Sequence, residues 1–154
     1  MNKRYKMKNL GIESLSSRHI QKAEINVVKD LVVLHTDKGP LYLTWEGDCC
    51  AHCYLAHVSG AENLIDAVIT EVYNSEWKVT GGSKDNCDVT ESMGTNIKTT
   101  KGYVTFESRL DHNGYYGGMI LVSDDEPMDQ YHSPRYGQDD QDDRLPSLSE
   151  LKDF

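Results

Sequence analysis

The 154-residue sequence has no long hydrophobic run and few basic or aromatic residues. No stretch of about 18 apolar residues occurs, so we expect no membrane-spanning helix. Lys and Arg number 16 against 25 Asp and Glu, which gives a net charge of −9. Clustered positive charge, the basis of affinity for nucleic-acid phosphates, is therefore scarce, and we expect neither direct nucleic-acid binding nor a membrane partner.

Cysteine is also scarce, with four residues of which two are adjacent, Cys49 and Cys50. Such a set is a poor disulfide framework, and reduced thiols are typical of cytoplasmic proteins. The basic start of the chain, residues 1–8, leads into polar residues with no apolar segment, so no signal peptide is expected. We therefore predict a cytoplasmic protein.

Charge and composition divide the chain into three parts. Residues 1–31 hold seven Lys/Arg and three Asp/Glu, whereas residues 111–154 hold three and eleven. Apolar periodicity stops after Ser123. We expect a basic arm at 1–8, one β-rich globular domain at 9–123 and an acidic tail at 124–154, since a polar, highly charged segment buries too little apolar surface to fold.

Strand patterns dominate the middle of the chain. Residues 31–36 and 41–45 flank the turn formers of 37–40, which predicts a hairpin. Residues 53–58 and 67–73 have strand composition as well. Between those two strands, the short segment 61–65 is predicted to form one helical turn.

The second half of the domain shows the same pattern. Residues 96–100 and 103–108 predict a hairpin around Lys101-Gly102, whereas residues 74–96 are rich in turn formers and predict a long loop. Asn113-Gly114 predicts a tight two-residue turn into a last strand at 115–122. The expected fold class is α+β dominated by antiparallel β-sheet, as a sandwich or a partly closed barrel with one or two short helices.

Possible metal ligands are concentrated between Asp48 and His57. Cys50 and Cys53 have the spacing of a zinc-binding pair, but a second pair is missing. On a regular strand Cys53 and His57 would share one face, and His52 would take the other. We favour a structural interpretation, in which the cysteines are small buried hydrophobes and Asp48 accepts hydrogen bonds from backbone N–H groups.

Two chemical alternatives stay open for this cluster. Cys50, Cys53 and His57 are the candidate metal ligands, and a reactive thiolate would need a base such as His57, His52 or His112. No cofactor is expected. The glycines at 81 and 82 lack the spacing of a phosphate-binding loop.

The tail holds most of the candidate partner-binding residues. Its carboxylates form a solvated charge run, and its end has Leu or Phe every third residue with a capping-box pattern at Ser147 and Glu150. The tyrosines after Asn113-Gly114 are interpreted as part of a hairpin turn, with a recognition tip as the alternative. The partner-binding candidates are Asp124, Asp125, Glu126, Asp139, Asp140, Asp142, Asp143, Leu148, Leu151, Phe154, Tyr115 and Tyr116.

Several short motifs together resemble a known family. They are the Asp-Cys-Cys step at 48–50, the Asn-Gly-Tyr-Tyr turn at 113–116, and supporting matches at 36–39, 60–65 and 101–105. The family they resemble consists of small uncharacterised proteins encoded largely by bacteriophages and prophages, and the resemblance covers roughly residues 9–122. It implies a phage protein that acts in the bacterial cytoplasm, and it implies no catalytic activity.

These observations favour a binding protein over an enzyme. The preferred hypothesis is a phage accessory protein that binds a host protein complex and inhibits or redirects it, as in host takeover or evasion of host defence. Its carboxylates would compete for a nucleic-acid-binding surface if the complex processes nucleic acid. The alternatives are a metal- or thiol-dependent enzyme centred on residues 49–57 and a virion or assembly component.

Overall fold

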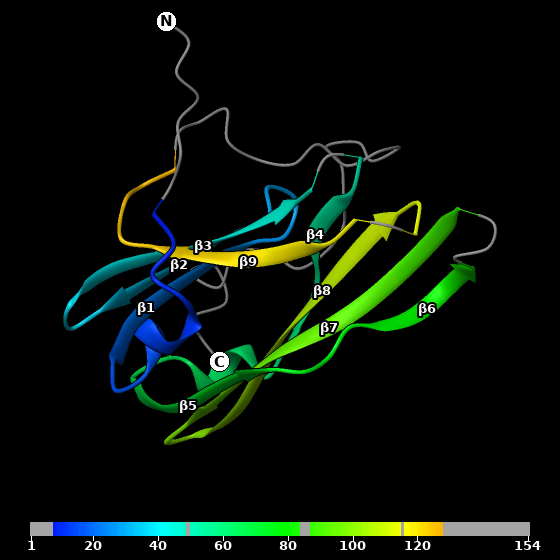
Figure 1. The fold of residues 1–154 in the computed structure, drawn as a ribbon. Helices are drawn as coiled ribbons and strands as arrows, with labels where there is room; N and C mark the ends of the chain where they lie inside the picture. The colour runs from blue at the N-terminus through cyan, green and yellow to red at the C-terminus, as the bar shows by residue number, and fades with distance from the viewer. Residues whose placement is uncertain (1–7, 49, 84–86, 115, 128–154) are drawn as a thin grey trace, which may run out of the picture.

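The computed structural model describes residues 8–48, 50–83, 87–114 and 116–127. In these ranges the chain forms nine strands and two single-turn 3-10 helices, η1 (Ile12–Leu15) and η2 (Ala61–Asn63) (Figure 1). The strands are β1 (His19–Asn26), β2 (Leu31–Thr36), β3 (Gly39–Gly47), β4 (His52–Ser59), β5 (Ala67–Asn74), β6 (Lys78–Ser83), β7 (Asp88–Thr99), β8 (Gly102–His112) and β9 (Gly118–Ser123).

All strand pairs are antiparallel and follow the order β4-β8-β7-β5-β1-β2-β3-β9, with β6 also paired to β7. The path divides into a first half of β1, β2, β3 and β9 and a second half of the other five strands. The halves join where His19 and Ile20 of β1 pair with Val68 and Ala67 of β5. The antiparallel sheet is confirmed and η2 matches the predicted helical turn, whereas the sandwich or barrel stays a prediction.

The core lies between the two halves. Trp45 of β3 meets Phe106 of β8 edge-to-face, with ring centroids 6.4 Å apart. The Trp45 indole N–H also donates to the Ser108 hydroxyl at 2.7 Å, and all three residues are buried. A buried indole without an acceptor would lose a hydrogen bond it makes in water, so this contact sets where β3 lies against β8.

Both predicted hairpins around short turns are confirmed. β2 pairs with β3 from the Leu31/Thr44 pair to the Thr36/Gly39 pair. β8 pairs with β7 over the whole length of β8. In each turn a threonine hydroxyl accepts a backbone N–H two residues on: Thr36 from Lys38 at 3.1 Å and Thr99 from Lys101 at 3.0 Å. Local turn chemistry therefore sets the register of both hairpins.

The predicted loop over residues 74–96 is wrong. Most of this stretch is strand, namely β6 and the first part of β7, and both β5 and β6 pair with β7. Ser75 lies between β5 and β6 and binds β7 at Gly94. Its N–H donates to the Gly94 carbonyl at 2.8 Å, and its hydroxyl accepts the Gly94 N–H at 2.9 Å. The glycines at 81 and 82 were interpreted as loop formers, but they lie beside a β-bulge in the β6–β7 pair.

The predicted tight hairpin at Asn113-Gly114 is also wrong. β8 pairs with β4 and β7, whereas the next strand, β9, pairs with β3. The connection after His112 therefore crosses from the second half to the first, and the last strand begins at Gly118 instead of residue 115. The sequence analysis also missed β1, because a bulge between Ile20 and Lys22 breaks its alternation.

Two edges of the strand path are capped by side chains. The Asp30 carboxylate, buried at the β1–β2 turn, accepts the Leu55 N–H of β4 at 3.0 Å. On β9, the Asn9 side chain accepts the Val122 N–H at 3.1 Å, and Leu10 donates to the Val122 carbonyl at 2.7 Å. Capped edges offer fewer free backbone groups to another chain.

The predicted division into arm, domain and tail stays a prediction, since residues 1–7 and 128–154 lie outside the described ranges. Within those ranges, no helix has the length and apolar character needed to cross a bilayer.

Candidate functional site

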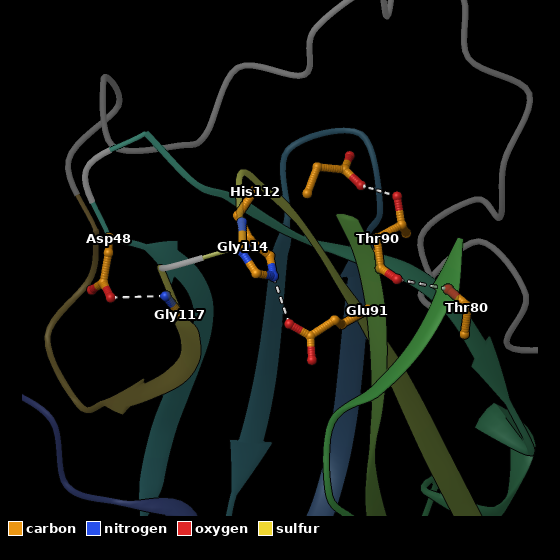
Figure 2. Close-up of polar contacts among 8 residues, drawn as sticks. Asp48, Thr80, Thr90, Glu91, His112, Gly114 and Gly117 are labelled. Atoms are coloured by element: carbon orange, nitrogen blue, oxygen red, sulfur yellow. Dashed lines mark hydrogen bonds and ion pairs between the residues drawn. The ribbon is translucent and has the colours of Figure 1, made fainter. Parts of the chain in front are cut away.

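Asp48 links two connections of the fold. Its backbone N–H donates to the Gly117 carbonyl at 2.9 Å, and its carboxylate accepts the Gly117 N–H at 2.9 Å (Figure 2). The Asp48 carbonyl also accepts the Ala51 N–H at 2.8 Å. The expected structural role of Asp48 is confirmed: it joins the β3–β4 connection to the segment that enters β9.

Cys53 of β4 is a buried thiol, as expected from the structural interpretation. Burial, followed by the negative charge of Asp30, raises the pKa of Cys53 to about 12, although a hydrogen bond from the Met119 backbone acts in the opposite direction. A Cβ atom on Gly118 would lie 2.8 Å from the Cys53 sulfur, so glycine lets β9 approach this close. At neutral pH Cys53 is therefore a protonated thiol and a poor nucleophile.

His57 lies on the other face of β4 from Cys53, so the shared face that we predicted is wrong. A β-bulge between Leu55 and His57 shifts the alternation by one residue. Cys53, Leu55 and Val58 are buried as a result, and His57 is exposed. A regular strand would have placed His57 beside Cys53.

The remaining members of the cysteine and histidine cluster are dispersed. The expected burial of the cysteines is wrong for Cys50, which is exposed and has a left-handed backbone with φ of 68°, and Cys87 is exposed as well. The His52 ring packs edge-on against Tyr54, with centroids 5.1 Å apart. Among the described residues, no three His, Cys, Asp or Glu side chains gather as a metal site would require. Cys49 lies outside those residues.

His112 is buried at the end of β8 and forms two hydrogen bonds (Figure 2). Its Nδ1 accepts the Gly114 N–H at 2.9 Å, and its Nε2 lies 2.5 Å from the Glu91 carboxylate. Since Nδ1 accepts a hydrogen bond, the proton resides on Nε2 and is donated to Glu91. Nδ1 holds the turn after β8 and Nε2 binds Glu91 of β7, so neither ring nitrogen is a free base.

The predicted partner-binding residues are described only in part. Asp124, Asp125 and Glu126 are exposed just after β9, and Tyr116 is half-buried. The candidates outside the described residues are Tyr115, Asp139, Asp140, Asp142, Asp143, Leu148, Leu151 and Phe154.

The outward side of β7 and β8, which we call the polar face, is a surface that the sequence analysis missed. Side chains on adjacent strands hydrogen-bond across it. The pairs are Thr90 with Asp111 (2.8 Å), Ser92 with Glu107 (3.1 Å) and Thr105 with Asn96 (2.9 Å), and Arg109 adds a contact to Glu107 (3.2 Å). Alternation of apolar and polar residues along both strands is the signal that could have revealed it.

The outward side of the first half has a different composition. Strand register places ten side chains on one surface across β2, β3 and β9, which we call the apolar face because most of them are apolar. They are Leu31, Val33, His35, Pro40, Tyr42, Thr44, Glu46, Met119, Leu121 and Ser123. Thr44 is only 3% exposed and Leu121 only 7%, although both point away from the core.

One comparison with known proteins identifies a family. The family model described as "Domain of unknown function (DUF7448)" matches residues 12–122. The chain belongs to this family. No curated protein and no solved structure matches the chain.

The DUF7448 match runs from the start of η1 to Val122, one residue before the end of β9. It therefore includes Asp48, Cys53, His112 and both outward faces. The exposed carboxylates of Asp124, Asp125 and Glu126 lie beyond it. The predicted resemblance to an uncharacterised family is confirmed by this match.

Proposed function

We propose that this protein is a phage accessory protein that binds a host bacterial protein complex and inhibits or redirects it in the cytoplasm. The observation that supports the proposal best is the distribution of negative charge. The chain has a net charge of −9, and the acidic stretch begins with exposed residues directly after the last strand of the family domain. Exposed carboxylates of this density attract basic surfaces over a distance of about 8–10 Å in physiological salt.

The arrangement of the reactive side chains also supports a binding role. The Cys53 thiol is buried with a pKa of about 12, and both ring nitrogens of His112 are hydrogen-bonded within the fold. These groups stabilise the structure in the positions they occupy. The same proposal includes the finer description of the fold as a sandwich, for which the contact between Trp45 and Phe106 across the two halves is the supporting observation.

The target we propose is a complex with a basic, nucleic-acid-binding surface. The carboxylates at 139, 140, 142 and 143 would then occupy positions that phosphates otherwise take, and binding would weaken as salt is raised. Nucleic acid should compete with the protein for the same complex.

The test is a quantitative pull-down from bacterial lysate with the full chain, followed by competition with DNA and RNA. A variant with Asp139, Asp140, Asp142 and Asp143 each changed to Asn should lose the captured complex. The matched control changes four exposed glutamates of the body to Gln and should retain it. These glutamates are Glu46, Glu62, Glu71 and Glu76. Equal capture by both variants would show that the tail charge has no role.

A further inference from the structure

Asn113 is the one asparagine in the sequence that is followed by glycine. The structure leaves this pair without its expected role, because the strands on either side of it do not form a hairpin. In an Asn-Gly pair no side chain shields the glycine nitrogen, which can attack the side-chain amide of the asparagine and expel ammonia. Gly114 has φ of 107°, a conformation that favours glycine over any residue with a shielding side chain. The pair is therefore a candidate for chemical conversion.

His112 lies where this reaction needs a base. Its Nδ1 accepts the Gly114 N–H at 2.9 Å, so the ring contacts the proton that must leave when the Gly114 nitrogen attacks (Figure 2). The N–H bond lies in the peptide plane, whereas the attacking electron pair lies above and below it, so the hydrogen bond leaves the line of attack open. Nδ1 is not free for an outside substrate, but it is in place for this one proton.

Glu91 supports His112 from the opposite side of the ring. Its carboxylate accepts the Nε2–H at 2.5 Å, which keeps the ring in the tautomer with an unprotonated Nδ1. When Nδ1 takes a proton, the ring becomes a cation beside this carboxylate. That ion pair is little screened by water, because the His112 and Glu91 side chains are only 3% and 14% exposed. The order of carboxylate, imidazole and proton donor is the one that general-base catalysis uses.

We infer that the folded chain converts its own Asn113 to aspartate and iso-aspartate, with His112 as the base. The Gly114 proton passes to Nδ1, and the nitrogen electron pair forms a bond to the side-chain carbonyl carbon of Asn113. The bond from this carbon to the amide NH2 then breaks, and the NH2 leaves with the Nδ1 proton as ammonia. Water opens the resulting succinimide at either carbonyl, which gives aspartate or iso-aspartate.

Asn74, which is followed by the small residue Ser75, provides an internal comparison. Its side-chain oxygen accepts the Thr95 hydroxyl at 2.6 Å, and the Ser75 N–H donates to the Gly94 carbonyl at 2.8 Å. A carbonyl oxygen takes up no proton at neutral pH, so the Ser75 N–H has a hydrogen-bond acceptor but no base. We expect no conversion at Asn74 on the time scale of conversion at Asn113.

Conversion of Asn113 changes the connection that crosses between the two halves. It adds a negative charge to a chain of net charge −9, and iso-aspartate also adds a CH2 group to the backbone before Gly114. The far end of this connection is fixed by the hydrogen bonds between Gly117 and Asp48. Loss of ammonia makes the change irreversible, so the converted fraction rises with the age of the molecule. The inference does not depend on the proposed host partner.

Peptide mass spectrometry of the aged full chain tests the inference. The protein is incubated at neutral pH, folded in buffer or unfolded in urea, and the tryptic peptide 110–135 is followed over time. The mass gain of an amide-to-acid change at Asn113 should appear roughly tenfold faster in the folded chain. A positioned general base contributes about 10²–10⁴-fold, and the ordered turn offsets part of this gain. Equal or slower conversion in the folded chain would overturn the inference, as would equal conversion at Asn74.

Two substitutions of His112 separate its role as a base from its structural role. His112→Asn keeps an oxygen near the Nδ1 position to accept the Gly114 N–H, and His112→Gln keeps an N–H near the Nε2 position to bind Glu91. Neither amide takes up a proton, so both should slow conversion of Asn113 about tenfold. His57→Gln, which changes an exposed histidine, should convert at the parent rate. Parent-rate conversion in a His112 variant that circular dichroism shows to be folded overturns the inference. If neither variant folds, the comparison of the folded and unfolded parent decides it.

Discussion

The polar face and the apolar face belong to one hydrogen-bonded path of strands and yet differ in how they meet the solvent. Across β7 and β8, hydroxyl, amide and carboxylate side chains satisfy one another, as Thr105 and Asn96 do at 2.9 Å. Across β3 and β9, Thr44 and Leu121 are buried on an outward surface. The first surface consists of polar side chains that hydrogen-bond to one another, whereas the second keeps Thr44 and Leu121 from water.

This difference changes what a substitution should cost. On the polar face, a group that loses its hydrogen-bond partner can bond to water instead. The net change in the free energy of unfolding is therefore small. Between the halves, and at the buried positions of the apolar face, a lost side chain leaves a cavity or an unsatisfied group. The four predictions below use this contrast, in order of decreasing effect.

Trp45→Ala should have the largest effect, because it removes the contact that joins the two halves. We expect a loss of about 3–5 kcal/mol in the free energy of unfolding, since the indole is buried and the Ser108 hydroxyl loses its donor. Urea denaturation followed by circular dichroism measures it. Trp77→Ala is the control, and its loss should be smaller because Trp77 is only partly buried. Equal losses would mean that Trp45 has no special role between the halves.

Leu121→Ala should separate the two outward faces. We expect a loss of about 2–3 kcal/mol, because Leu121 is 7% exposed although it points outward. Tyr103→Ala, on the outward side of the second half, should change stability by no more than about 0.5 kcal/mol. Thermal and urea unfolding of both variants measure the contrast. A cost for Tyr103→Ala as large as that for Leu121→Ala would remove the distinction between the faces.

Alkaline pH should weaken the contact between β4 and β9 through Cys53. The folded-state pKa of this thiol, about 12, lies above its ordinary value near 9. The thiol therefore stabilises the fold fully below pH 9, and this contribution is lost between pH 9 and 12 at about 1.4 kcal/mol per pH unit.

The measurement is urea unfolding with reducing agent at pH 8 and pH 10. The stability advantage of the parent chain over Cys53→Ala should shrink by about 1.4 kcal/mol between these two values. Cys87→Ala, which removes an exposed thiol, should show no such change. An unchanged advantage at pH 10 would contradict a buried, protonated Cys53.

Thr105→Val should have the smallest effect. It removes one cross-strand hydrogen bond from the polar face while keeping a β-branched side chain, so we expect a loss of about 0.2–1 kcal/mol. Asn96→Ala is measured both in the parent chain and in the Thr105→Val background. The difference gives the coupling energy between the two residues. A coupling well above 1 kcal/mol would show that this face is as tightly organised as the core.

The features that the sequence predicted correctly are local ones. The hairpin of β2 and β3 and the hairpin of β7 and β8 combine strand alternation with a Thr-x-x-Gly turn, and both signals lie within a few residues. The role of Asp48 also followed from residue type. Errors arose where a bulge shifts the alternation, as in β1 and at His57, or where glycines hide a strand, as in β6.

The partners of distant strands could not be derived from the same patterns. Asn113-Gly114 has the composition of a hairpin turn, but the strand that follows pairs with β3, about 75 residues earlier. The burial of Leu121 depends on that crossing, and no local pattern encodes it. Residue type therefore predicted the Asp48 to His57 segment as a candidate site. Neither outward face was predicted.

By itself the sequence determined the acidic character of this protein, its antiparallel strands and its two tight hairpins, because composition and alternation act over short stretches of chain. Only the tertiary structure decided which strands meet, which histidines are enclosed and which outward surface is left apolar. The physical reason is that register and bulges set the face on which each side chain lies, and these depend on contacts between residues far apart in the chain.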